Sequence, residues 1–271
     1  MSTLWNRKNY IVDQEFISDQ YIYEYDIKAA NVSVLRAYEK ISEEQYQNYL
    51  MMPKQLREYN IGMMIKMENN GSMLKSETYN TIQKGIEEAK YQLFMLNNLD
   101  DSNVIRVASD AVYVAKKVDG SLPNTIVPVG KGTVQFKVNG PWNMMIKMPS
   151  NVILFISFLS DRYDVAVKGI RNELLQFHQP ILGFICEILS YITGSDKKST
   201  LYKFKDFYKQ YLDRELPIDF YREFNAGSSF RIMNSDIGTQ FIDERYKQYL
   251  DISFNNFVLR HIYHIIMTYM R

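Results

Sequence analysis

Two stretches of the sequence decide the fold: Tyr21-Ile22-Tyr23-Glu24-Tyr25-Asp26-Ile27-Lys28 and Val104-Ile105-Arg106-Val107-Ala108-Ser109-Asp110-Ala111-Val112-Tyr113-Val114. Both are rich in aromatic and β-branched residues, which favour β-strands. Apolar residues at helical spacing follow the first stretch, so Asp26 stands where a strand meets a helix. Asp110 lies within the second stretch, which we expect to be one extended strand. If the two strands are neighbours in a sheet, the carboxylates of Asp26 and Asp110 come together.

The residues between and after these stretches predict an α+β fold. Ser42, followed three residues later by Gln45, has the pattern of a capping box and opens a short helix that Pro53 ends or restarts. Ser76 is placed to cap a long amphipathic helix over residues 77–97. Short β-prone segments separated by Gly and Pro then indicate an antiparallel sheet or an extension of the first one, at residues 125–129, 133–138 and 144–148.

The C-terminal part is predicted to be mainly helical. Helical segments are expected at residues 165–177, 180–191, 203–212 and 243–270. We therefore expect an α+β domain over residues 1–155 and a helical domain over residues 156–271.

Composition excludes several classes of function. The formal net charge is only +1, so binding to nucleic acid or to an anionic membrane depends on a local patch rather than on the field of the whole protein. Cys186 is the only cysteine, so the Cys₄, Cys₃His and Cys₂His₂ ligand sets of structural zinc sites cannot be formed. The N-terminus lacks a secretory pattern, and the apolar windows 152–159 and 181–192 are too short or are interrupted by Glu187. We expect an intracellular protein that does not enter a membrane.

The two aspartates carry the candidate chemistry. Phosphoryl transfer to a growing strand uses magnesium ions that neutralise charge on the attacking and leaving oxygens. Mg²⁺ prefers hard oxygen ligands, which Asp26 and Asp110 supply if they end facing strands. The sequence therefore predicts a Mg²⁺ site that becomes a two-metal site if the protein is active.

The residues around both aspartates strengthen this prediction. Asp26-Ile27-Lys28-Ala29-Ala30-Asn31-Val32 resembles the first palm motif of family B DNA polymerases, in which an aspartate ends a strand and the chain turns into a helix. Ser109-Asp110-Ala111-Val112-Tyr113-Val114 resembles the latter part of their second metal motif, a tight hairpin followed by a hydrophobic strand. The resemblance implies a palm-like sheet with Asp26 and Asp110 as catalytic, metal-binding residues. Ala108 stands where the family has the first aspartate of the hairpin.

The same resemblance, which covers roughly residues 17 to 190, implies contacts with nucleic acid. Asp164-Val165-Ala166-Val167-Lys168-Gly169-Ile170-Arg171 is similar to a segment after the palm that faces the primer and template, which makes Lys168 and Arg171 candidate phosphate contacts. Lys54 and Arg57 are the nearest match to the basic residues of the family's fingers. The insertion that carries them is short, Lys54 and Asn60 do not have the family's spacing, and there is no room for a proofreading exonuclease.

Simpler interpretations stand beside these. Asp26 could cap a helix that begins at Ile27, and the basic residues could be ordinary solvated surface. His261 and His264 lie one helical turn apart, but no acid or cysteine pattern joins them, so a packed aromatic helix is the preferred interpretation. The apolar stripe of that helix favours burial over docking to a partner.

Three functions follow from these patterns. The first is a reduced, palm-derived phage or viral protein that associates with nucleic acid in replication or transcription and retains metal-dependent nucleotidyl transfer in part. The second is an inactive palm-like scaffold or virion component that binds other proteins through its aromatic helices. The third is a minimal nucleotidyltransferase whose site is completed by a partner subunit. All three place the protein in the host cytoplasm or in the virion.

Overall fold

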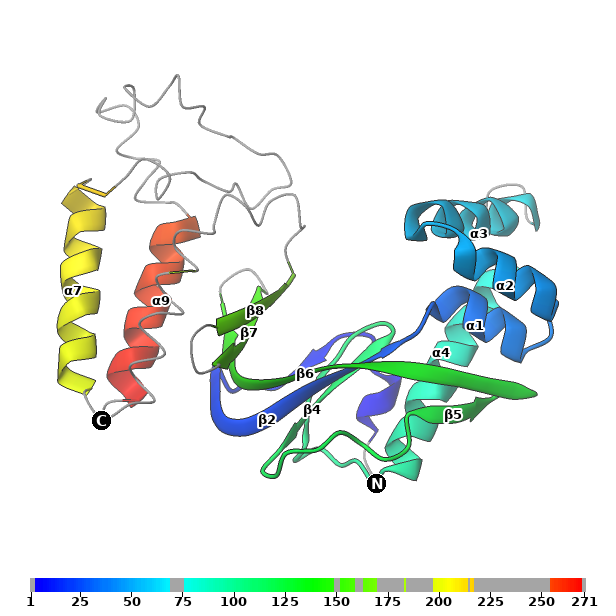
Figure 1. Cartoon of the computed structure of the whole chain (residues 1–271), viewed down its shortest axis with the longest axis horizontal. Helices are drawn as coiled ribbons and strands as arrows, with labels where there is room; N and C mark the ends of the chain where they lie inside the picture. Colours follow the sequence, from blue (N-terminus) through cyan, green and yellow to red (C-terminus); the bar gives the residue numbers. More distant parts are fainter. Residues whose placement is uncertain are drawn as a thin grey trace, which may run out of the picture. The chain divides into compact units, whose positions relative to one another are not determined.

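The structure is a computed structural model that describes residues 3–68, 76–148, 152–158, 163–169, 183, 197–213, 215–216 and 254–269. The fold is α+β, as predicted (Figure 1). The described elements are, in chain order, η1 (Leu4–Asn6), β1 (Tyr10–Ile11), β2 (Phe16–Ile27), α1 (Ala30–Ala37), α2 (Glu43–Met51), α3 (Lys54–Glu68), α4 (Glu77–Leu96), β3 (Val104–Val107), β4 (Ala111–Lys116), β5 (Ile126–Val129), β6 (Gly132–Lys147), β7 (Ile153–Phe158), β8 (Tyr163–Lys168), α7 (Lys197–Asp213) and α9 (Phe254–Tyr269).

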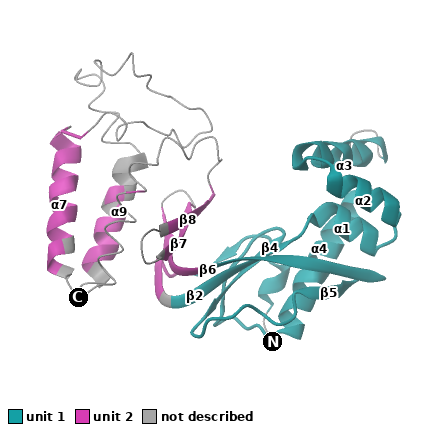
Figure 2. Ribbon diagram, viewed as in Figure 1, with its two compact units in different colours: residues 1–13, 19–141 teal, residues 14–18, 142–271 magenta. Residues whose placement is uncertain are grey.

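The chain divides into two compact units (Figure 2). The first contains residues 1–13 and 19–141, and the second contains residues 14–18 and 142–271. The strand order is β1-β3-β4-β2-β6-β7-β8, with β5 paired to β6. The domain boundary near residue 155 stays a prediction.

The two aspartate-bearing stretches are neighbours in the sheet of the first unit, as predicted. β2 runs antiparallel to β4, and in this register Asp26 lies opposite Ala111. The second stretch is not the one extended strand that its composition predicted, but the hairpin that its resemblance to the second metal motif implied. It forms two antiparallel strands, β3 and β4, and the amide of Ala108 donates to the carbonyl of Ala111 at 2.8 Å across the turn. Ser109 and Asp110 are the two turn residues, and such short polar side chains favour turns.

Helices α1 and α4 cover one face of this sheet. Tyr23, Tyr25 and Ile27 of β2 point into their core, so Glu24 and Asp26 belong to the opposite face. Ser76 caps α4 as predicted, accepting from the amide of Tyr79 at 3.1 Å. The core also contains a set of apolar residues from the two helices, namely Val32, Val34, Leu35, Ile82, Ile86, Ala89 and Leu93.

The insertion between α1 and α4 folds as two helices, α2 and α3. The capping box at the start of α2 is confirmed: the amide of Gln45 donates to Ser42 Oγ at 3.2 Å, and the amide of Ser42 donates to Gln45 Oε1 at 2.8 Å. Pro53 directly precedes α3, because proline is tolerated at a helix start but not inside a helix. The insertion therefore presents Lys54 at the first position of α3.

Two expectations for the later strands are wrong. Residues 165–168 are not helical, because Tyr163–Lys168 form β8, which pairs with β7 through matches such as Ile156 with Val165. Alternating Val, Ala and Val suit a strand better than a helix. The remainder of the predicted helix over 165–177, and that over 180–191 except Gly183, lie outside the described residues. The separate strands predicted at 133–138 and 144–148 are one long strand, β6, which continues through Gly140, where the backbone has a positive φ of 105° that favours glycine.

The C-terminal helices α7 and α9 pack on each other within this unit. The rings of Phe204 and Tyr263 are stacked with centroids 5.9 Å apart. The preferred interpretation of the last helix, burial of its apolar stripe, agrees with Leu259, Ile262, Ile265 and Ile266, all of which are buried. The ring of His261 forms a hydrogen bond of 2.6 Å between Nε2 and the carbonyl of Lys147, so this histidine has a structural partner. Over the described ranges, no helix combines the length and apolar character needed to cross a bilayer.

Candidate metal and phosphate site

One cavity of the first unit brings together four of the six predicted site residues. It has a volume of about 200 Å³, and its lining includes Asp26, Asp110, Lys54 and Arg57. The other lining residues are Ile27, Ala29, Ala30, Asn31, Glu58 and Ile61. Three acidic and two basic residues, from three separate parts of the sequence, therefore share one pocket.

The backbone holds the two aspartates in fixed positions. Asp26 is the penultimate residue of β2, and the amide of the next residue, Ile27, donates to the carbonyl of Asp110 at 3.0 Å. Asp110 is the second residue of the β3–β4 turn, where Ser109 Oγ donates to its Oδ1 at 3.0 Å. Both aspartates are half-buried. Their separation is thus set by strand pairing rather than by flexible loops.

Asp26 does not cap a helix. Helix α1 begins at Ala30, and its N-cap residue is Ala29, which has a left-handed backbone with φ 49° and contributes no side-chain hydrogen bond. The interpretation of Asp26 as the cap of a helix starting at Ile27 is therefore wrong. Since the first turn of α1 lines the cavity through Ala30 and Asn31, its amides lie at the cavity wall.

The basic side of the cavity comes from one face of α3. Lys54, Arg57, Glu58 and Ile61 recur at three- and four-residue steps, which places them along one stripe of the helix. Lys54 Nζ lies 3.7 Å from Glu58 Oε1, but both groups are exposed, so this ion pair contributes little. The guanidinium of Arg57 forms no ion pair with any part of the chain that the structure describes. Arg57 is thus available to an anionic ligand.

Asn60 does not belong to this cavity. It lines a separate, open groove with Tyr49, Met63 and Met64, and its amide donates to Met52 Sδ at 3.5 Å. The fingers-like pattern of the sequence is therefore incomplete at the cavity, which receives Lys54 and Arg57 only.

A buried lysine lies beneath the hairpin, and sequence reasoning missed it. Lys90 of α4 is 1% exposed, and its Nζ donates to the carbonyls of Arg7 at 3.2 Å and Ala108 at 3.4 Å. Burial lowers the pKa of this amine, and the nearby carboxylates of Glu87 and Asp110 oppose that effect. One sequence signal was present, since Lys90 lies on the apolar stripe of α4, four residues after Ile86.

A third carboxylate on the Asp26 face of β2 is already engaged. Glu24 is buried and accepts hydrogen bonds from the hydroxyl of Tyr113 and, at 3.0 Å, from Asn139 Nδ2. Burial and the contact with Glu24 raise the pKa of Tyr113 far above its usual value. Within the described ranges, no group of three or more His, Cys, Asp or Glu residues is arranged to hold a metal ion. Asp26 and Asp110 are therefore the sheet-borne carboxylates of the cavity, and Glu58 of its lining pairs with Lys54.

Of the two remaining predicted residues, only Lys168 is described, and it is not among the described residues that line the cavity. Lys168 is the last residue of β8 in the second unit, and Arg171 lies outside the described residues. Their role as phosphate contacts stays a prediction.

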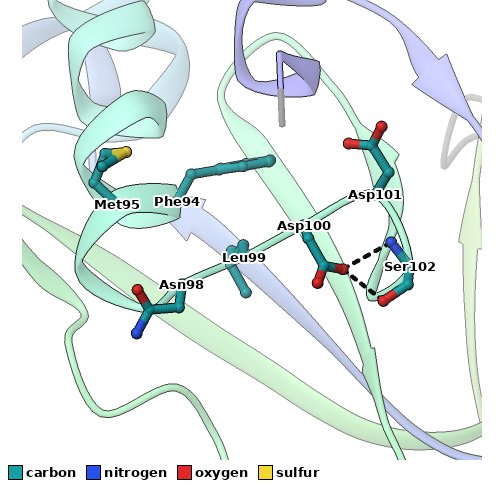
Figure 3. Close-up of a pocket in the computed structure, with 7 residues that line it drawn as sticks. All are labelled: Phe94, Met95, Asn98, Leu99, Asp100, Asp101 and Ser102. Atoms are coloured by element: carbon teal, nitrogen blue, oxygen red, sulfur yellow. Dashed lines mark hydrogen bonds between the residues drawn. The ribbon is translucent and has the colours of Figure 1, made fainter. Parts of the chain in front are cut away.

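A larger, open depression of about 650 Å³ lies at the turn between α4 and β3 (Figure 3). Its acidic residues are Asp100 and Asp101, whose carboxylates point in different directions (Figure 3). Asp100 accepts from the amide of Ser102 at 2.8 Å and from its hydroxyl at 2.5 Å, and these bonds lower the pKa of Asp100. The carboxylate of Asp100 therefore stabilises its own turn. Among its described lining residues the depression does not combine acidic with basic side chains, as the cavity at Asp26 and Asp110 does.

Fold and cavity together define an α+β protein in which two sheet-borne aspartates share a pocket with two basic residues of a helical insertion. The chain belongs to the family described as Bacteriophage PBS1 gene 130 protein, which matches residues 1–267. No curated protein matches the chain. The phage origin expected from the sequence is supported, and the family description states no activity.

Proposed function

We propose that this phage protein is derived from a polymerase palm, binds Mg²⁺ through Asp26 and Asp110, and takes part in nucleotidyl transfer during phage replication or transcription. The observation that carries the proposal is the single cavity that joins both aspartates to Lys54 and Arg57. These residues come from three separate elements, and the resemblance to family B polymerases assigns all four to one site.

The donor set fits Mg²⁺ shared with a phosphate. Mg²⁺ keeps several waters and is commonly held by one or two carboxylates together with substrate phosphates. Asp26 and Asp110 supply two hard oxygen donors, and Cys and His are absent from the cavity lining. When bound, the ion would neutralise charge on the reacting phosphoryl oxygens.

The basic residues fit the phosphates themselves. Arg57 offers a planar guanidinium that can bind phosphate through two parallel hydrogen bonds, and Lys54 adds a mobile point charge. The amides in the first turn of α1 add partial positive charge at the wall of the cavity. A phosphate chain placed here would have cations from α3 on one side and metal-bound carboxylates on the other.

The size of the cavity limits what it holds. A volume of about 200 Å³ lies below the range of about 300–1,000 Å³ that is usual for whole small-molecule ligands. The cavity therefore suits a metal ion and a phosphate chain, and a nucleotide's sugar and base would extend beyond it. Selection of the base would then depend on a template or on a partner subunit.

A second candidate function is a palm-like scaffold that binds other proteins. The helical insertion exposes several large apolar side chains, including Met51 at 81% and Met67 at 75%. The hairpin has Ala108 where the second metal motif of family B polymerases has its first aspartate, so it lacks one carboxylate. Exposed methionines are frequent at protein-binding surfaces.

Metal titration separates the two candidates. Mn²⁺ is titrated into the wild-type chain by calorimetry and by electron paramagnetic resonance, with and without a ribo- or deoxyribonucleoside triphosphate. We expect binding that Asp26→Asn and Asp110→Asn each weaken by about tenfold or more, since each removes one of two carboxylates. Asp101→Asn, an exposed carboxylate outside the cavity, is the matched control and should leave binding unchanged. If the wild type binds no Mn²⁺ under either condition, the metal-dependent function is ruled out and the protein-binding scaffold is the candidate that remains.

A further inference from the structure

Helix α7 carries a stripe of exposed lysines interrupted by one tyrosine. Lys198, Tyr202, Lys205 and Lys209 follow one another at steps of four, three and four residues, so they share one face of the helix. All four are exposed, and Tyr202 is exposed to 73%. From Lys198 to Lys209 the stripe is about 16 Å long at about 1.5 Å per residue.

The opposite face of α7 is already used for packing. Phe204, Phe207 and Tyr211 are buried, and Phe204 stacks on Tyr263 of α9. The apolar face is therefore not available for insertion into a lipid surface, which an interfacial amphipathic helix requires. The exposed stripe is the part of α7 that remains for a partner.

Charge is concentrated on this helix. Its sequence, KKSTLYKFKDFYKQYLD, contains five lysines and two aspartates, whereas the whole chain has a formal net charge of +1. Lys198 and Lys205 form no ion pair with the described residues, and Lys209 lies 3.9 Å from Asp213, at the limit of an exposed pair. Lys198 and Lys205 thus offer positive charge to an anion, whereas the exposed Asp206 of the same helix accepts a hydrogen bond from Gln210.

We propose that this lysine and tyrosine stripe binds single-stranded nucleic acid, with phosphates on the lysines and an unpaired base on Tyr202. Basic side chains track a phosphate backbone without reading its sequence, and aromatic rings stack on bases that have no partner in a duplex. The stripe belongs to the second unit and is independent of the cavity, so the proposal stands whether or not the cavity binds metal.

The test uses the full chain in the presence of EDTA, so that a failed metal site cannot affect it. Fluorescence anisotropy measures binding to short oligo(dT), oligo(U) and a duplex of equal length, and sedimentation measures binding to anionic phosphatidylserine vesicles. We expect both single strands to bind more tightly than the duplex, with a slope of log affinity against log salt of about −2 for three phosphate contacts. No binding to vesicles is expected.

Variants assign the binding to the stripe. Combined Lys198→Glu, Lys205→Glu and Lys209→Glu should weaken single-strand binding by about tenfold or more and remove most of the salt dependence. Tyr202→Ala should weaken it by about tenfold with the slope unchanged, and Tyr202→Phe should retain it. The matched control changes three exposed lysines elsewhere, Lys66→Glu, Lys117→Glu and Lys137→Glu. Equal loss in the control, tighter binding to duplex or vesicles, or no single-strand binding by the wild type would overturn the proposal.

Discussion

Gly85 is the position at which the structure makes the sharpest quantitative prediction. It lies in α4 where this helix packs on α1, and a Cβ added there would lie 2.3 Å from Val34 Cγ1 and 3.1 Å from Tyr38 Cε2. Val34 is fully buried and β-branched, so its methyl group cannot rotate away freely. Gly85→Ala should therefore force α1 and α4 apart.

Gly62 provides the matched control, because it is also a helical glycine but has nothing within 4 Å of an added Cβ. Alanine improves helix propensity by about 0.8–1.0 kcal/mol at either site, whereas overpacking a core costs about 1–3 kcal/mol. Gly62→Ala should raise the free energy of unfolding by about 1 kcal/mol. The free energy of unfolding of Gly85→Ala should be about 2–3 kcal/mol lower than that of Gly62→Ala, since the clash involves a rigid methyl group.

Urea unfolding followed by circular dichroism measures both variants. A second readout is Mn²⁺ affinity, because α1 carries Ala30 and Asn31 at the cavity. Val34→Ala combined with Gly85→Ala removes the clashing methyl groups and should recover more stability than the two single changes predict by addition. If Gly85→Ala proves as stable as Gly62→Ala, the close packing of α1 on α4 is refuted.

Two further predictions concern buried ionisable groups. Burial raises the pKa of Tyr25 to about 12, above about 10 for an unfolded tyrosine, so the unfolded state loses its proton first and stability falls as pH rises from about 10 to 12. Tyr25→Phe should be less stable near neutral pH, where the Leu122 amide loses its acceptor at 2.7 Å, and its difference from wild type in urea unfolding should shrink over that alkaline window by up to about 2.7 kcal/mol. If the difference in free energy of unfolding between Tyr25→Phe and wild type stays constant with pH, the raised pKa of Tyr25 is contradicted. Lys90→Met leaves the carbonyls of Arg7 and Ala108 without this donor and should lower the free energy of unfolding by about 1–3 kcal/mol. Faster hydrogen exchange at the amides of Ala108 and Ile27, which donate to the carbonyls of Ala111 and Asp110, should accompany the loss, and unchanged exchange would mean that Lys90 does not hold the hairpin.

Local patterns account for the parts of the fold that the sequence predicted. The caps at Ser42 and Ser76 and the apolar stripe of α4 depend on neighbours within a few residues, so they could be inferred directly. The pairing of β2 with β4 is a long-range contact, and it followed from the resemblance of the flanking residues to two motifs that meet in one sheet.

The misses have a common physical reason. Composition alone predicted one strand over residues 104–114, because they are apolar on both sides of Ser109 and Asp110 and the turn contains no Gly or Pro to mark it; only the resemblance implied the hairpin. Lys90 is buried because carbonyls from residues 7 and 108 accept its hydrogen bonds, and no local pattern encodes that meeting. Residues 163–168 became a strand because β7 offered a partner edge. In each case a contact with residues distant in the sequence decided the local structure or the burial.

The hairpin suggests how the site differs from a palm with three carboxylates. Family B polymerases have another aspartate at the position of Ala108 in this chain. The ammonium of Lys90 lies 3.4 Å from the carbonyl of Ala108. The positive charge of Lys90 beneath the hairpin opposes the approach of a second cation. For the proposed site we therefore expect one divalent ion between Asp26 and Asp110 rather than two, and Arg57 and Lys54 would supply the remaining positive charge to a phosphate. Metal stoichiometry consequently bears on the chemistry as directly as metal affinity does.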